Sequence, residues 1–228
     1  DVMKYTITGD NLQFVNCQLE QGEMMQSEAG RMVYMTGNAV MEAKMGGFWK
    51  GVKRMMNGAS FMLVNYHSDD GACVVGFGGS VPGKILDIDV SQGSWLVQSS
   101  GYIASEMDVK LDLAFQKRLG SMLFGGEGLL LQRLTGTGKC FIGACGDFNV
   151  VDLKPGEVYK VSTAHAVAWQ DSVNYDISAA GGIKTSIFGG EGLFVTTLTG
   201  PGKIVIQSMS LGELAASLIP YMPKNTSS

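Results

Sequence analysis

The six residues FGGEGL at Phe124–Leu129 return unchanged at Phe188–Leu193, which is 64 positions further along the chain. The same interval carries LTGTGK at Leu134–Lys139 onto LTGPGK at Leu198–Lys203. Two segments that recur in the same order and at the same spacing indicate an internal duplication, and such a period is the sequence signature of a repeat protein.

A third copy of the unit lies nearer the N-terminus. Each copy carries a four-residue motif that ends in glycine, at Leu19–Gly22, Val90–Gly93 and Leu153–Gly156. Glycine tolerates the backbone conformations of tight turns, so we expect a turn at each of these sites. The sequence thus predicts three tandem units, which we place at residues 1–89, 90–153 and 154–228.

Strand patterns and composition favour an all-β fold. Ile85–Val90 places apolar residues at every second position, as a half-buried strand does. The 228 residues include 32 glycines but only 5 prolines, and 45% are hydrophobic, which provides both turns and a core. We predict a small β-sandwich in each unit, with the three units packed around a pseudo-threefold axis.

A short helix is predicted near the C-terminus. Ser210–Glu213 has the spacing of a capping box, in which the serine and glutamate side chains each accept a hydrogen bond from the other residue's backbone N–H. Leucines and alanines then recur with the helical period until Pro220 ends the run. We expect the helix to dock on the β-body by its apolar face, with binding to a partner as the alternative.

The motifs resemble those of a known family. GEGLF at 190–194 and the segments Leu198–Ile204 and Ile206–Ser208 are similar to the C-terminal signature of the family named for altered inheritance of mitochondria, a mitochondrial biogenesis family with many bacterial members. Ala29–Tyr34 resembles the family's N-terminal signature, and the likeness covers roughly residues 5 to 210. No targeting segment is evident, so the chain is similar to the bacterial-type members.

This resemblance implies a fold but no reaction. It implies three tandem domains similar to the tryptophan RNA-binding attenuation protein, each a β-sandwich of the double-stranded β-helix type. Bacterial members have no established activity, and the mitochondrial member is associated with inner-membrane architecture, which suggests scaffolding. The resemblance therefore favours an uncharacterised scaffold or binding protein over an enzyme.

Charge and hydropathy exclude several classes of protein. Lys and Arg total 17 against 21 Asp and Glu, so the net charge of −4 gives no basic footprint for nucleic acid. No apolar run approaches the roughly 20 residues that span a bilayer. We expect a soluble cytoplasmic protein in which nucleic acid is an unlikely partner. Its cysteines lack metal-binding spacing and are expected to be buried free thiols, at Cys17, Cys73, Cys140 and Cys145.

Catalytic and metal-binding patterns are missing from the sequence. His67 and His165 are the two histidines; we predict His67 in a solvated loop and place His165 at the position of Tyr102 and Arg31 in the other copies. Gly136–Lys139 lacks the first glycine and the Ser or Thr of a phosphate-binding loop. We therefore predict no catalytic residue, no metal and no cofactor. An enzyme would instead require a pocket with an acid/base pair.

The repeated Gly-Gly-Glu-Gly motif is interpreted as a structural turn that leads into a strand. An alternative is a shallow anion site made by clustered backbone N–H groups. The residues concerned are Gly126, Glu127, Gly128, Gly190, Glu191 and Gly192.

One segment suggests binding to a surface. Lys44, Lys50, Lys53 and Arg54 surround Trp49, and a helix from residue 48 would separate basic from apolar side chains. A short surface helix that covers the sandwich is the simpler interpretation. The alternative is that residues 44–54 bind RNA or an anionic membrane surface. Our main prediction is a non-enzymatic scaffold or binding protein whose partner is a protein or a second copy of the chain.

Overall fold

The described part of the chain is almost entirely β-structure. Residues 3–43, 62–117, 128–179 and 194–223 are described in the computed structural model, and within them the chain forms nineteen β-strands and one α-helix. The all-β prediction is therefore confirmed. The predicted strand at Ile85–Val90 is present as β8 (Ile85–Asp89), and the predicted C-terminal helix is present as α3 (Leu211–Leu218).

The strands fall into three modules of six, preceded by β1 (Lys4–Thr8). The first module contains β2 (Phe14–Leu19), β3 (Met24–Glu28), β4 (Met32–Met35), β5 (Val40–Ala43), β6 (Leu63–His67) and β7 (Cys73–Gly78). The second contains β8, β9 (Trp95–Gln98), β10 (Tyr102–Glu106), β11 (Val109–Lys117), β12 (Leu129–Gly136) and β13 (Lys139–Gly143). The third contains β14 (Phe148–Leu153), β15 (Val158–Ser162), β16 (Ala166–Gln170), β17 (Asn174–Ala179), β18 (Phe194–Thr199) and β19 (Gly202–Gln207).

The same pairing pattern occurs in all three modules. In each one the sixth strand lies between the first and the third, and the fifth lies between the second and the fourth, with every pair antiparallel. Each module therefore contributes three strands to one sheet and three to another. The turn before each second strand contains a glycine with positive φ, at Gly22, Gly93 and Gly156.

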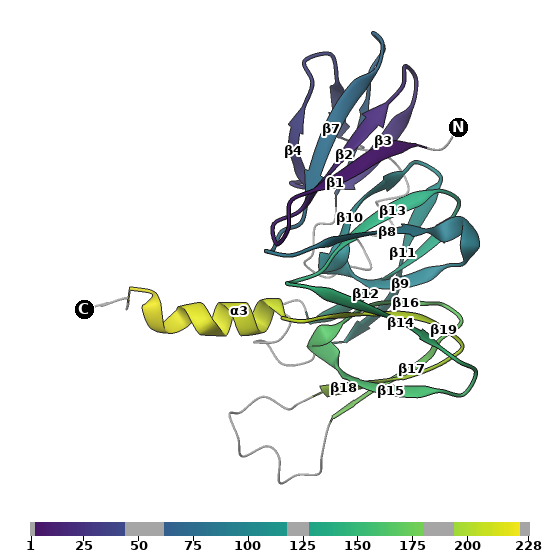
Figure 1. Ribbon diagram of the computed structural model, residues 1–228, viewed down its shortest axis with the longest axis vertical. Coiled ribbons are helices and arrows are strands. Elements are labelled where there is room, and N and C mark those ends of the chain that lie inside the picture. The colour runs from purple at the N-terminus through teal and green to yellow at the C-terminus, as the bar shows by residue number, and fades with distance from the viewer. Residues whose placement is uncertain (1–2, 44–61, 118–127, 180–193, 224–228) are drawn as a thin grey trace.

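Shared sheets join the modules to each other. The third strand of one module pairs with the second strand of the module before it, as β10 does with β3 and β16 does with β9. This produces two six-stranded sheets that each cross a module boundary. Figure 1 shows the modules in a row along the long axis of the molecule, and the predicted pseudo-threefold arrangement is not confirmed. Each pairing between a second strand and a third strand adds one module to the end of the row. Among the described strands, no strand of the first module pairs with a strand of the third.

Strand pairing also bears on the predicted unit boundaries. β8 pairs with β13, and β14 pairs with β19, so each of these strands belongs with the residues that follow it. The boundaries at 89/90 and 153/154 instead assign each strand to the preceding unit. The repeated motifs in the sequence begin at the glycine turn, which follows the first strand of each module. The first strand pairs with the sixth strand of the same module, and this long-range pairing has no signal in the local sequence. The division into three domains stays a prediction.

Each module has a bulge at the same place, and two of the three bulges link the hydrophobic cores of neighbouring modules. The ladder between the third and sixth strands skips one residue, at Val33, Ile103 and Val167. A bulge adds one unpaired residue to a strand, and its side chain departs from the regular alternation of side chains between the two faces of the sheet. Ile103 packs into the core cluster of the first module and Val167 into that of the second, so both are buried within the preceding module. The modules therefore share cores as well as sheets.

We predict that Ile103→Ala lowers the free energy of unfolding by about 3 kcal/mol, because it removes buried methyl and methylene groups and leaves a cavity between two modules. Val33→Ala is the matched control, since Val33 holds the same bulge position but is 60% exposed, and it should change stability by less than about 0.5 kcal/mol. Equilibrium urea unfolding in dilute solution measures both. Equal losses of unfolding free energy in the two variants would contradict the burial of Ile103 in the core of the first module.

Candidate functional site

The segment predicted to bind a surface lies outside the described residues. This applies to Lys44, Trp49, Lys50, Lys53 and Arg54, so binding by residues 44–54 stays a prediction. The Gly-Gly-Glu-Gly motifs are also largely outside the described ranges. Gly126 and Glu127 are not described, nor is the whole second motif.

Gly128 is the one member of those motifs that is described. Its φ is +76° and it directly precedes β12, which it leads into as a turn residue would. A positive φ at this point is easily adopted by glycine and is costly for other residues.

The two histidines occupy positions that differ from those expected. His67 is the last residue of β6 and is paired with Met24, so it does not lie in a solvated loop. His165 precedes β16 as Gly101 precedes β10 and Arg31 precedes β4, so its counterpart in the second module is Gly101 and not Tyr102. The second module has one residue fewer between its glycine turn and its third strand, and this shifts the alignment.

The four cysteines are buried free thiols, as the sequence predicts. Burial raises the pKa of each thiol, most strongly at Cys17 and Cys140, which keeps them in the unreactive neutral form. In the described residues, no three His, Cys, Asp or Glu side chains are arranged to hold a metal ion.

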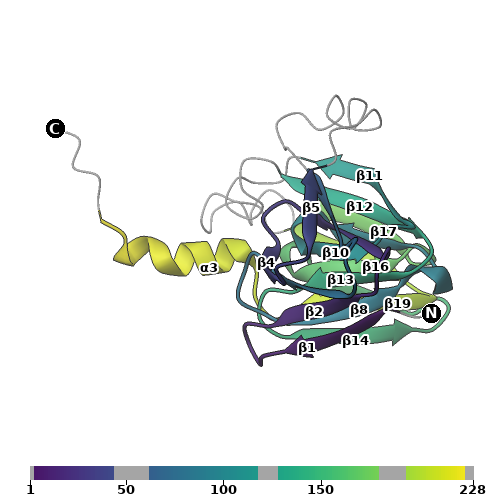
Figure 2. The ribbon, with the colours of Figure 1, turned by 90° about the horizontal axis from the view of Figure 1, so that it is seen from above.

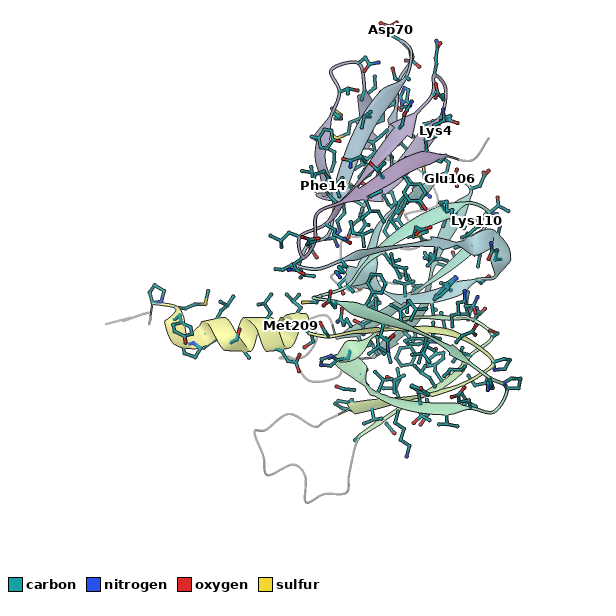
Figure 3. All side chains as sticks on the ribbon, viewed as in Figure 1. Lys4, Phe14, Asp70, Glu106, Lys110 and Met209 are labelled. Atoms are coloured by element: carbon teal, nitrogen blue, oxygen red, sulfur yellow. The ribbon has the colours of Figure 1, made fainter. Side chains whose placement is uncertain are left out.

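An open groove of about 530 Å³ lies where the first two modules meet. Its charged groups are the carboxylates of Glu23, Glu106 and Asp108. Glu106 is engaged in a structural contact, because its Oε2 accepts a hydrogen bond of 2.5 Å from the backbone N–H of Lys139. Figure 3 places Glu106 at the side of the body away from the helix.

The hydrogen bond of Glu106 belongs to the repeat. Gln170 accepts one of 2.8 Å from the N–H of Lys203, and Thr36 accepts one of 3.1 Å from the N–H of Val74, at the equivalent positions of the other modules. Each bond fixes the end of a third strand to the start of a sixth strand. The carboxylate of Glu106 is therefore explained by the fold.

A second polar cluster attaches β1 to the second module. The Tyr5 hydroxyl donates to Asp87 Oδ2 at 2.7 Å, and Lys139 Nζ donates to the same oxygen at 3.1 Å. Burial and the bond to Asp87 raise the pKa of Tyr5 to about 12. Burial raises the pKa of Asp87, but the bonds from Tyr5 and Lys139 outweigh it and lower the pKa overall. These groups satisfy one another, so the cluster holds two elements together.

The C-terminal helix is the most unusual surface of the molecule. Figures 1 and 2 show α3 extending away from the β-body, and Figure 3 places Met209 where the helix leaves it. None of the helical residues is buried, so the prediction that its apolar face docks on the body is wrong. The large apolar side chains exposed along this segment are Met209, Leu211, Leu218, Ile219, Tyr221 and Met222.

The base of α3 is firmly attached. The predicted capping box is present: Ser210 Oγ accepts from the Glu213 N–H at 3.1 Å, and Glu213 Oε2 accepts from the Ser210 N–H at 3.0 Å. His165 lies between body and helix, with Nδ1 2.9 Å from the Gln207 carbonyl oxygen and Nε2 3.1 Å from Glu213 Oε1. Both partners are acceptors, so only the doubly protonated imidazole makes both bonds at once.

The charge on Glu213 is part of this attachment. Partial burial raises the pKa of its carboxyl, but the hydrogen bonds from Ser210 and His165 and the charge of His165 together lower it. The ionised carboxylate is therefore favoured in the folded helix. The spacing of Ser210 and Glu213 predicts the capping box, but the contact with His165 joins residues 48 positions apart and has no local signal in the sequence.

These features define a class of protein: an all-β stack of cross-paired modules that carries a projecting amphipathic helix. The chain belongs to the mitochondrial biogenesis AIM24 family, whose profile matches residues 5–209. The resemblance found in the sequence is thus confirmed at the level of the family. None of the described helices is long and apolar enough to cross a lipid bilayer.

Two proteins of Streptococcus pyogenes are similar to this chain. An uncharacterised protein of serotype M6 is 28% identical over 235 residues, covering 98% of this chain and 93% of its own length. A crystal structure of another protein from this species has a TM-score of 0.78 at 26% identity, covering 96% of this chain and all of its own. Neither comparison supplies an activity.

We predict that Ser210→Ala loosens α3 without affecting the body. Removing the cap costs about 1 kcal/mol, which should raise amide hydrogen exchange in residues 213–218 about fivefold. Ser217→Ala is the control, because Ser217 is exposed on the same helix and its hydroxyl donates to the Leu214 carbonyl oxygen and not to a group of the capping box. Unchanged exchange in the Ser210 variant would show that the capping box does not hold the helix.

Proposed function

We propose that this protein is a non-enzymatic scaffold whose β-stack presents α3 to a protein partner. The observation that carries the proposal is the exposed apolar surface of α3 on a base anchored by Ser210, Glu213 and His165. A large exposed apolar surface on a fixed element is typical of an interaction site.

The composition of the helix favours a protein over a membrane. Within Leu211–Leu218 the one charged residue is Glu213, and there is no lysine or arginine. Helices that lie on anionic membranes carry basic residues on their polar face. The apolar residues Leu211, Leu214 and Leu218 have the i, i+3, i+7 spacing instead. Side chains at this spacing lie on one face of a helix and pack into an apolar groove of a partner protein.

The body suits the role of a scaffold. Sheets that cross both module boundaries make relative motion of the modules costly, so the helix would be held at a defined place on a rigid support. The repeated pairing pattern also supports the finer likeness to domains of the tryptophan RNA-binding attenuation protein, which we retain as part of this proposal. A cytoplasmic location is likewise retained as a prediction.

The proposal predicts that partner binding depends on the leucines of α3. Proteins that co-purify with the tagged chain from its source cells should be lost from a Leu211→Glu/Leu218→Glu variant, with affinity reduced at least about tenfold for each purified partner. Ser217→Glu is the control for added negative charge, because it places one carboxylate on the same helix and removes no leucine. Quantitative mass spectrometry and calorimetry measure the two effects.

Two results would count against this function. Recovery of the same proteins with the double variant would show that α3 is not the binding element. Retention of the chain by anionic liposomes or single-stranded RNA, lost when Lys50, Lys53 and Arg54 are replaced by Ala, would favour the alternative that residues 44–54 bind these ligands.

A further inference from the structure

Two strand edges interrupt the repeating pattern of the molecule. β4 is the third strand of the first module and β15 is the second strand of the third module. Their counterparts pair with each other at both module boundaries, as β10·β3 and β16·β9. Among the described strands, β4 has only β7 beside it and β15 has only β18. Figure 1 shows these two edges at opposite ends of the row.

The other sheet edges do not have this property. They are formed by β1 and by first and fourth strands of modules, namely β5, β8, β11, β14 and β17. No first or fourth strand is paired across a module boundary in either six-stranded sheet, so these edges are simply the margins of the stack. The first strand β2 does pair with β1, but β4 and β15 alone occupy positions that are paired across a module boundary elsewhere in the described chain.

The burial of equivalent residues shows what the β4 edge lacks. Val33 is 60% exposed, whereas Ile103 and Val167 at the same bulge position are 0% and 2% exposed. The latter two side chains are covered because a preceding module receives them. Among the described strands, no module precedes the one that holds Val33.

The β15 edge shows the matching difference. The registers at the module boundaries make Tyr159 equivalent to Trp95 and Met25. Tyr159 is 37% exposed, whereas Trp95 is 5% and Met25 is 0% exposed. An aromatic residue at this edge therefore lacks the cover that a following module gives to its counterparts.

Lys160 is compatible with pairing at this edge. A lysine on an edge strand often blocks association. The equivalent residue in the first module is Gln26, which is buried at the boundary and donates from Nε2 to the Val109 carbonyl oxygen at 2.8 Å and to Ser105 Oγ at 3.3 Å. The position thus accepts a polar donor when carbonyl oxygens of the next module face it, and a lysine ammonium is such a donor.

We propose that copies of this chain associate head to tail, with β4 of one copy pairing antiparallel with β15 of another to continue the six-stranded sheets. The two existing boundaries fix the register, which pairs Tyr34 with Val161, Met35 with Lys160 and Thr36 with Tyr159. Val33 then enters the third module of the neighbouring copy. Because the two surfaces differ, the contact is heterologous and leaves one free edge at each end of a dimer.

Directed disulfide formation tests both the surface and the register. Opposite residues of an antiparallel pair lie about 5 Å apart at Cα, within the range of a disulfide. A Met35→Cys chain mixed with a Lys160→Cys chain should form a cross-linked heterodimer under mild oxidation, while each variant alone stays monomeric on a non-reducing gel. The native thiols are buried in both chains.

The control for this cross-link is Val150→Cys mixed with Met35→Cys, since Val150 is an exposed valine on the β14 edge outside the proposed contact. A heterodimer no more abundant than this control would overturn the proposal. So would a homodimer formed by either variant alone, because it would indicate a symmetric contact.

Sedimentation equilibrium gives an independent measurement. Val33→Glu should weaken self-association at least about tenfold, because it places a charge in the contact, while Val150→Glu should leave it unchanged. Circular dichroism melting in dilute solution verifies that both variants are folded. Equal behaviour of the two variants, or a wild-type chain that is monomeric at about 100 µM, would contradict the proposal.

The assembly goes beyond the scaffold function proposed above and does not depend on it. The Leu211→Glu/Leu218→Glu variant leaves both edges intact and should associate as the wild-type chain does. Loss of partner binding with intact association, or the reverse, separates the failure of one proposal from the failure of the other.

Discussion

The hydrogen-bonded pairing between the third strand of one module and the second strand of the module before it is the interaction on which the architecture depends. Without it each module would be a pair of three-stranded sheets, which is the smallest sheet size expected to be stable on its own. The two ladders β10·β3 and β16·β9 convert three modules into one continuous β-structure. The bulge residues Ile103 and Val167 then place each module's side chain in the core of its neighbour, so that backbone pairing and packing reinforce each other.

This arrangement explains why the polar groups of the body serve the fold. The side chains of Thr36, Glu106 and Gln170 differ in chemistry but accept the same backbone hydrogen bond in their modules. Tyr5, Asp87 and Lys139 likewise join β1 to the second module. Exposed apolar side chains are found on α3 and on the two end strands, where the repeat stops.

The helix and the end strands are exposed for different physical reasons. α3 follows the last strand of the last module, and its backbone hydrogen bonds are satisfied internally, so it can project without an energetic penalty for unpaired amides. The edges of β4 and β15 carry backbone groups whose counterparts in the other modules are paired. A partner for α3 would contribute mainly apolar contacts, whereas a partner for the edges would contribute a ladder of hydrogen bonds and a defined register.

The sequence alone determined the repeat, the all-β class, the buried cysteines and the C-terminal helix with its capping box, because these depend on local spacing and on glycine at turns. It could not determine the row of modules, the partner of β8, the contact of His165 with Glu213 or the exposure of α3. Each of these joins or separates residues that lie far apart in the chain. Several arrangements of the strands would bury the same alternation of apolar and polar residues. The hydrogen-bonded ladders between modules select one arrangement, and no local stretch of sequence predicts these ladders.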